Sequence, residues 1–217
     1  MKIVLISKDS KRSQQIYDSL SKHDIEWVKH PEDIESTLNR INPDWVFVYH
    51  WSHIITEDLY SKFRMISFHT GNLPEDRGGS PLQNQILSGT KFTKVNAIVV
   101  QDPVDSGAVY ASRSISLQGT LSEIWDVITD ASIGLINDIL KQNPTPVEQT
   151  GESKTFKRKK DNILKFDSIH SVYDQIRMLD SDEYPSTHLL IDGYKIDFSR
   201  AKIDNDEVIA DVKIYKI

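Results

Sequence analysis

The hydrophobic pattern of the first 140 residues repeats as short apolar runs separated by longer amphipathic stretches. The runs have the length and composition of buried strands, and they are Lys2–Ser7, Ile25–Val28, Trp45–Tyr49 and Met65–His69. Between the first two, Arg12–Lys22 places Ile16 and Leu20 on one face at helical spacing. Strands that alternate with helices predict an α/β fold with a doubly wound, mostly parallel sheet, which binds ligands at the carboxyl ends of its strands.

The pattern changes after Leu73-Pro74. The elements predicted there are a helix over Pro81–Ser88, antiparallel strands over Lys94–Gln101 and Ala108–Leu117, and a long helix from a capping Thr120 to Lys141. Residues 145–162 are polar, and we predict an irregular segment. Beyond it, a helix and three strands are predicted at Ser171–Leu179, Thr187–Ile191, Lys195–Phe198 and Val208–Ile217. We therefore expect a main domain over residues 1–150 and a small strand-rich C-terminal subdomain over residues 151–217.

The composition is that of a folded soluble protein, because 38% of the 217 residues are hydrophobic and 27% are charged. The longest apolar runs are too short to cross a bilayer, and the first residues do not resemble a signal peptide. Both observations favour a cytoplasmic protein with no membrane partner. The chain has no cysteine, which excludes disulfides, thiolate metal sites and a cysteine nucleophile.

The charge balance argues against nucleic acid as a partner. The formal net charge is −6, whereas the neutralisation of phosphates needs an excess of Lys and Arg. One basic run, Lys157–Lys160, departs from this balance. It is either a solvated connector or a clamp for the diphosphate of a nucleotide-linked substrate.

Two ionisable residues, His69 and Asp105, lie in or next to loops between the predicted strands. His69 falls where a predicted strand ends and a loop shaped by Gly71 and Pro74 begins. Asp105 lies in a turn, Val104–Gly107, between two predicted strands. Taken singly, each has a plain structural explanation, since a histidine at such a place is often a satisfied core residue and Asp-Ser-Gly is a common turn.

Taken together, these residues resemble the folate-dependent formyltransferases, which include glycinamide ribonucleotide, methionyl-tRNA and nucleotide-sugar N-formyltransferases. The shared pattern reads here as His69, Leu73-Pro74, Arg77-Gly78 and Asp105–Gly107. The separation of His69 from Asp105 also matches the family, and the resemblance covers essentially the whole chain. It implies a Rossmann-like catalytic domain that transfers a formyl group from 10-formyltetrahydrofolate to an amine.

The resemblance also implies roles for individual residues. A protonated His69 stabilises the negative oxygen of the tetrahedral centre, and Asp105 keeps the imidazole charged and relays protons between the two nitrogens. The implied folate contacts are Trp51, Ser52, His53 and Ile54, in the loop that matches the pterin pocket, and Gln101, Asp102 and Val104. The implied substrate contacts are Asn72, Arg77, Gly79, Gln83 and Tyr184.

Among the acceptors of the family, a nucleotide-linked amino sugar agrees best with the sequence. Ile6–Lys11 lacks the glycine-rich turn with which the glycinamide ribonucleotide branch binds phosphate. The acidic balance and the short C-terminal appendage disfavour transfer RNA. The segments Gly78–Asn84 and Ile176–Asp180 resemble formyltransferases of sialic-acid-type sugar pathways, such as those of pseudaminic or legionaminic acid.

In such an enzyme, Arg77 and the basic run would contact the diphosphate, and Tyr184 or Tyr173 would stack on the base. Alternatively, Tyr173 is a core residue and Arg77 only braces its loop. A homodimer is a further expectation that comes from the family.

One position departs from the family pattern. Relatives usually have Asn-x-His, in which the asparagine amide helps to hold the formyl oxygen, whereas this chain has Ser67-Phe68-His69. A serine hydroxyl donates a single hydrogen bond from a shorter side chain, and such a donor can be worth about 3 kcal/mol. Asn72 and Asn84 are candidate replacements.

Two other function classes therefore stay open. The chain could be a weak or inactive homologue that binds folate or sugar. The second class, a metal-dependent hydrolase, would use His50, His53, His69 and Asp105, although we expect no metal because His50 and His53 lie at a strand exit and not on a helix.

Overall fold

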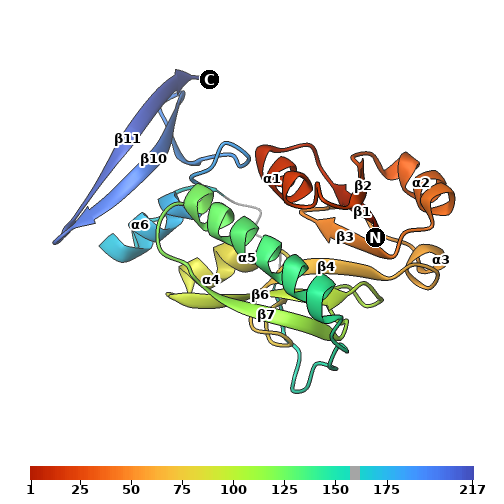
Figure 1. The fold of residues 1–217 in the computed structure, drawn as a ribbon. Coiled ribbons are helices and arrows are strands. Elements are labelled where there is room, and N and C mark those ends of the chain that lie inside the picture. Colours follow the sequence, from red (N-terminus) through yellow and green to blue (C-terminus); the bar gives the residue numbers. More distant parts are fainter. Residues whose placement is uncertain (157–161) are drawn as a thin grey trace. The chain divides into compact units, whose positions relative to one another are not determined.

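Six strands form the central sheet of the computed structural model, which describes residues 1–156 and 162–217 (Figure 1). Their order is β2-β1-β3-β4-β6-β7. The strands are β1 (Lys2–Ser7), β2 (Asp24–Val28), β3 (Trp45–Tyr49), β4 (Met65–Thr70), β6 (Phe92–Val99) and β7 (Val109–Ser116). The first four run parallel, and β6 runs antiparallel to β4. The predicted α/β fold with a mostly parallel sheet is confirmed.

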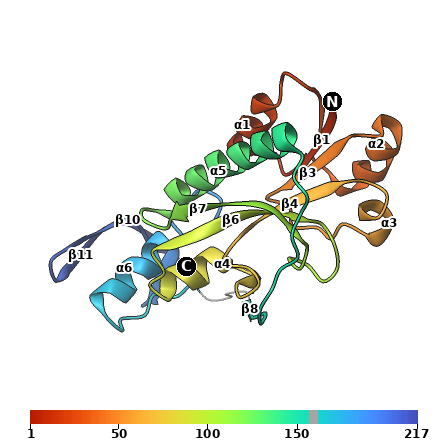
Figure 2. The ribbon, with the colours of Figure 1, turned by 60° about the horizontal axis from the view of Figure 1, so that its bottom comes forward.

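Helices alternate with these strands along the chain (Figure 2). They are α1 (Lys11–Ser19), the 3-10 turn η1 (Pro31–Asp33), α2 (Ile34–Ile41), α3 (Glu57–Tyr60), α4 (Pro81–Leu87), α5 (Leu121–Gln142) and α6 (Ile169–Arg177). The first helix is shorter than the predicted Arg12–Lys22. It ends early because the N–H groups of Leu20 and Ser21 bond to carbonyls three residues back, which tightens the last turn.

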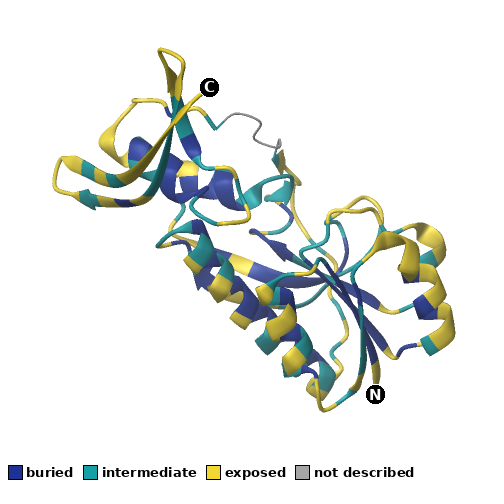
Figure 3. Cartoon of the chain, turned by 90° about the horizontal axis from the view of Figure 1, so that it is seen from above, coloured by how far each residue is buried: buried dark blue, intermediate teal, exposed yellow. Residues whose placement is uncertain are grey.

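The sheet is covered on both faces, as a doubly wound fold requires. Val4, Val46 and Val48 point to one face, where they pack against Ile34 and Leu38 of α2. The alternate residues point to the opposite face. There Tyr49 shares a hydrogen bond of 2.9 Å with Thr129 of α5. In Figure 3 the central strands are accordingly almost entirely buried.

The chain divides into two compact units, which we call the first and the second unit. The first unit consists of Met1–Arg77, Lys94–Ile115 and Ile128–Lys154. The second consists of Gly78–Thr93, Ser116–Val127 and Thr155–Ile217. The boundary between residues 150 and 151 that the sequence favours stays a prediction. No helix in the described part of the chain is long and apolar enough to span a membrane.

The second unit contains a three-stranded antiparallel sheet in the order β11-β10-β9. Its strands are β9 (Thr187–Ile191), β10 (Tyr194–Asp204) and β11 (Glu207–Lys216). The strand β10 extends well beyond the predicted Lys195–Phe198, because a bulge at Arg200, with φ of +51°, shifts the register and pairing with β11 then resumes. Among the described residues, no strand pairs with the outer edge of β11.

The segment that we predicted to be irregular, residues 145–162, contains some pairing. Thr155–Phe156 form β8, which pairs with β5 (Arg77–Gly78). Val147 forms an isolated antiparallel bridge with Val109. These contacts anchor the chain after α5, and the prediction of a wholly irregular segment was wrong in this respect.

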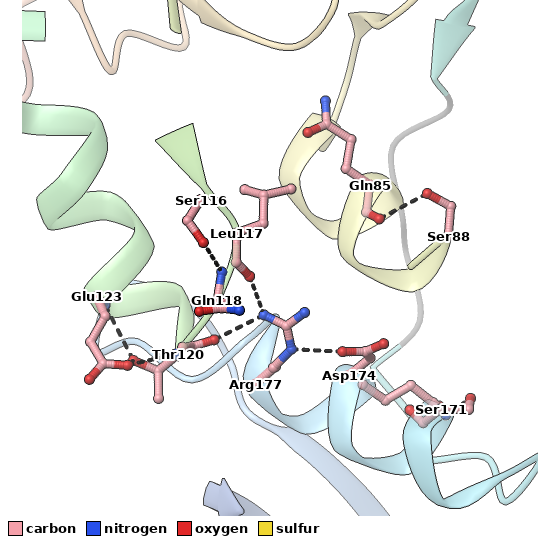
Figure 4. A network of polar contacts seen from close by, with 12 residues as sticks. Gln85, Ser88, Ser116, Leu117, Gln118, Thr120, Glu123, Ser171, Asp174 and Arg177 are labelled. Carbon is pink, nitrogen blue, oxygen red and sulfur yellow. Dashed lines mark hydrogen bonds and ion pairs between the residues drawn. The ribbon is translucent and has the colours of Figure 1, made fainter. Parts of the chain in front are cut away.

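A buried arginine organises the second unit (Figure 4). The guanidinium of Arg177, on α6, donates to the carbonyl oxygens of Leu117 and Gly119 and pairs with Asp174 at 2.7 Å. Thr120 and Glu123 form a reciprocal capping box at the start of α5, since each side chain accepts from the backbone N–H of the other. The predicted cap at Thr120 is therefore present, and α6 is tied to the segment that leads into α5.

Candidate active site

His69 lies near the end of β4, opposite Asn96 of β6. The buried Asn96 amide donates to the carbonyl oxygens of His69 (3.3 Å) and Gly71 (2.7 Å), and its oxygen accepts from Ser112 (2.7 Å). These bonds fix the backbone on both sides of the turn out of the strand. Asn96 is absent from the residues that the sequence indicated. The sequence feature that could have indicated Asn96 is a polar residue in the middle of an otherwise apolar predicted strand.

His69 and Asp105, which the family pattern pairs, do meet in the structure. Nδ1 of His69 lies 3.2 Å from Oδ1 of Asp105, and both side chains are largely buried. Asp105 has a φ of +63°, in the left-handed region. The turn approaches β6 so closely that a Cβ on Gly107 would lie 1.8 Å from the carbonyl oxygen of Val99. Glycine is therefore required where the turn meets the strand.

The other ring nitrogen also faces an acceptor. Nε2 of His69 lies 2.6 Å from the carbonyl oxygen of Asp76, in the loop that follows β4. A carbonyl oxygen can only accept, so Nε2 carries a hydrogen, and the Asp105 carboxylate likewise accepts from Nδ1. The arrangement thus favours the imidazolium cation.

Burial favours the neutral imidazole and is the largest single influence on the pKa of His69. The hydrogen bond and negative charge of Asp105, together with the Asp76 carbonyl and charge, outweigh it. The pKa of His69 is consequently raised above its ordinary value of 6.5. The site therefore favours a cationic hydrogen-bond donor, which suits the stabilisation of a developing oxyanion.

Ser67 lies two residues before His69 on β4, between Val48 and Ile98 of the neighbouring strands. Residues two apart on a strand share a face, so its hydroxyl is on the same side of the sheet as the imidazole. The structure also separates the two candidate replacement donors. The Asn84 amide already donates to the carbonyl oxygens of Gly79 and Ser80. For the side-chain amide of Asn72, no hydrogen-bond partner occurs among the described residues.

The residues implied as folate contacts lie in the first unit, around loops that follow strands. Trp51 packs partly buried against the core beneath α2, and its ring lies 5.1 Å from that of His53. Ser52 and Ile54 are exposed. Gln101 donates to Ser106 in the turn that holds Asp105, while Asp102 and Val104 are exposed.

The implied substrate residues divide between the two units. Arg77, in the first unit, directs Nε and Nη2 at the side-chain oxygen of Gln149. Gly79 and Gln83 belong to the second unit, where Gly79 donates to the Phe156 carbonyl and Gln83 is buried. Tyr184 lines a polar cavity of about 840 Å³ in the second unit. Their roles in substrate binding stay predictions.

Two further sequence hypotheses concern Tyr173 and the basic run. Tyr173 is partly buried against the core of the second unit, as its alternative interpretation expects. Lys157–Lys160 lie outside the described residues. Within residues 1–156 and 162–217, no group of three or more His, Cys, Asp or Glu side chains is placed to hold a metal ion, and His50, His53, His69 and Asp105 form no such group.

Comparison with known proteins places the chain among formyltransferases. Residues 27–130 match the family model described as formyl transferase, and residues 158–215 match that of the methionyl-tRNA formyltransferase C-terminal domain. A solved structure of methionyl-tRNA formyltransferase from Clostridium thermocellum is 32% identical, with a TM-score of 0.94 over 100% of this chain and 99% of that chain. Both His69, on β4, and Asp105, in the turn between β6 and β7, fall within the matched residues 27–130. The chain belongs to the formyl transferase family.

Other relatives are more distant. Methionyl-tRNA formyltransferase from Sulfurihydrogenibium sp. is 26% identical over 73% of this chain, which spans 56% of that protein's length. The chain therefore covers little more than half of this curated relative. WlaRD, a sugar 3N-formyltransferase whose structure was solved with dTDP and 5-N-formyl-THF, is 15% identical, with a TM-score of 0.68 over 98% of this chain and 97% of that chain. At that identity the likeness concerns the fold alone.

Proposed function

We propose that the protein transfers a formyl group from 10-formyltetrahydrofolate to an amine. The observation that carries this proposal is the His69 imidazole, whose two ring nitrogens both face acceptors. A cationic imidazole that is held in this way can donate to the formyl oxygen and stabilise the oxyanion that forms when the amine attacks. The Nε2 hydrogen bond that the Asp76 carbonyl now accepts would pass to that oxygen.

The bond changes are those of an acyl transfer. The acceptor nitrogen forms a bond to the formyl carbon, the bond from that carbon to the folate nitrogen breaks, and one proton moves from the acceptor nitrogen to the folate nitrogen. Asp105 keeps His69 charged through these steps and can pass the proton. Among the residues of the first unit, Trp51 offers an aromatic surface for the flat pterin ring.

The acceptor that we propose is a nucleotide-linked amino sugar. Support comes from the Gly78–Asn84 segment, which resembles sugar-modifying relatives, and from a fold shared with WlaRD, whose structure contains dTDP. The net charge of −6 also disfavours a polyanionic acceptor. The family assignment by itself identifies only the transferred formyl group, so the acceptor is an additional proposal.

Methionyl-tRNA is the second candidate acceptor. The observation in its favour is the match of residues 158–215 to the C-terminal domain of methionyl-tRNA formyltransferase, together with the 32% identity to the Clostridium thermocellum protein. The two acceptors differ strongly in charge, so the salt dependence of binding would also distinguish them.

One experiment decides between these candidates. The chain would be incubated with 10-formyltetrahydrofolate and either a panel of UDP-, dTDP- and GDP-linked 4-amino sugars or methionyl-tRNA, with formyl gain followed by mass spectrometry. The proposal expects formyl transfer to a sugar, slowed by at least about two orders of magnitude in His69→Ala. Transfer to methionyl-tRNA alone would contradict the sugar acceptor. Folate binding without any transfer would identify an inactive homologue.

A further inference from the structure

Gln149, in the segment after α5, forms four hydrogen bonds with its side-chain amide. Its Nε2 donates to the carbonyl oxygens of Asp105 (2.9 Å) and Gly107 (2.8 Å). Its Oε1 accepts from Nε (3.0 Å) and Nη2 (2.6 Å) of Arg77. All four residues belong to the first unit, and the amide's two hydrogens and two lone pairs are all used.

The donor side of this amide holds the turn that carries Asp105. A φ of +63° is uncommon for a residue with a side chain, so surrounding contacts must stabilise it. The two hydrogen bonds from Gln149 hold the turn at the carbonyl groups of Asp105 and Gly107. Because the backbone of Asp105 is fixed in this way, its carboxylate stays directed at Nδ1 of His69, 3.2 Å away.

The acceptor side holds the loop on the other side of the ring. Arg77 directly follows Asp76, whose carbonyl oxygen lies 2.6 Å from Nε2 of His69. Arg77 is anchored a second time, since its backbone N–H donates to the Lys154 carbonyl, in the same segment as Gln149. The position of the Asp76 carbonyl is therefore coupled to Gln149 through one peptide unit.

We infer that Gln149 is a positioning residue that places both hydrogen-bond partners of the His69 ring at once. It does not touch the imidazole. It joins the turn that supplies the acceptor for Nδ1 to the loop that supplies the acceptor for Nε2. This inference concerns the site used in the proposed formyl transfer, and it assigns Arg77 the role of bracing its loop.

The charged groups whose placement the inference concerns are the carboxylates of Asp105 and Asp76, which both raise the pKa of His69. Gln149→Met keeps the length of the side chain and removes all four hydrogen bonds without adding charge. We expect the pKa of His69, followed by NMR of its ring protons in the absence of any folate or acceptor, to fall toward its ordinary value. We expect kcat to fall at least tenfold, with KM changing less than threefold.

Gln142→Met is the matched control, because Gln142 is exposed at the end of α5 in the same unit. It should leave both the His69 titration and kcat unchanged. Arg77→Met tests the acceptor arm separately and replaces Gln149→Met should that variant not fold. It should lower the pKa of His69 while the bonds from Gln149 to Asp105 and Gly107 remain.

A folded Gln149→Met variant in which the pKa of His69 equals the wild-type pKa would overturn the inference. The same holds if the variant is less stable but its His69 titration is unchanged, because Gln149 would then have a merely structural role. If Gln149→Met does not fold, an unchanged pKa in Arg77→Met would overturn it. The NMR titration of His69 does not depend on turnover, so it can be measured even if the protein transfers no formyl group. A failure of the proposed function can therefore be distinguished from a failure of the positioning role.

Discussion

The carbonyl oxygen of Asp76 lies 2.6 Å from Nε2 of His69, while Asp105 faces Nδ1 of the same ring. A loop carbonyl thus accepts the hydrogen bond that the proposed reaction needs for the formyl oxygen. The close approach depends on Gly71, where a Cβ would lie 2.6 Å from Cβ of Asp76 and 3.3 Å from Nε2 of His69. In the proposed reaction, the Asp76 carbonyl would have to give up this bond when the formyl oxygen binds at Nε2.

The first prediction concerns the catalytic pair. We expect His69→Ala and Asp105→Ala each to lower kcat by at least about two orders of magnitude, because one removes the cationic donor and the other the group that keeps it charged. The measurement is steady-state formyl transfer with the acceptor identified in the screen. As a control, each variant should unfold at the same temperature as the wild type. Near-wild-type activity in either variant would contradict the assignment.

The second prediction concerns pH and stability. Since the pKa of His69 is raised in the folded protein, its charged form stabilises the fold below about pH 6.5, and this contribution is lost as pH rises through the folded pKa. Urea unfolding from about pH 5 to about pH 9 should show the loss in the wild type. Asp105→Asn should flatten it. A wild-type profile equal to that of Asp105→Asn would contradict the raised pKa.

The third prediction concerns the Asp105 turn. Gly107→Ala should lower the free energy of unfolding by about 3 kcal/mol or more, because its Cβ would overlap the backbone of Val99. Gly193→Ala is the control. Its φ of +79° is strained for alanine, but no atom lies within 4 Å of the added Cβ, so it should cost only about 1 kcal/mol. Equal losses in denaturant titrations would refute the close approach.

The fourth prediction concerns the donor that replaces the usual asparagine. Ser67 is on the same face of β4 as His69, so Ser67→Asn should add an amide donor beside the imidazole and raise kcat, by up to about a hundredfold. No gain in Ser67→Asn, combined with a collapse of kcat in Asn72→Ala, would instead assign the donor to Asn72. Binding of tetrahydrofolate serves as the control for an intact site.

Much of this arrangement is predictable from the sequence because it follows from periodicity. Trp45–Tyr49 is an uninterrupted apolar run and forms β3 with the predicted bounds. His69 and Asp105 could be paired because their spacing is a family pattern. The contacts of Asn96 and Gln149 could not be predicted from the sequence, because each side chain binds backbone carbonyls far away in sequence. A carbonyl is present at every residue, so no side-chain pattern marks which one will be used.

The strand β11 ends the sheet of the second unit with an apolar edge. Its most exposed apolar residues are Ile209, Val212, Ile214 and Tyr215, and the exposed Ile217 directly follows the strand. An unpaired edge of this kind is a template for another strand. Two copies of β11 paired antiparallel about Val212 would set Asp211 opposite the partner subunit's Lys213, twice by symmetry, which matches opposite charges.

Pairing through this edge could form the expected homodimer, and the extent of dimerisation would then depend on protein concentration. We expect the sedimentation coefficient to rise with protein concentration in the wild type. Val212→Lys should abolish the rise, because it places like charges at the symmetry axis. Association that persists in this variant would exclude pairing through β11. Because an unpaired edge can also template fibrillar stacking, pairing through β11 would at the same time protect the protein against aggregation.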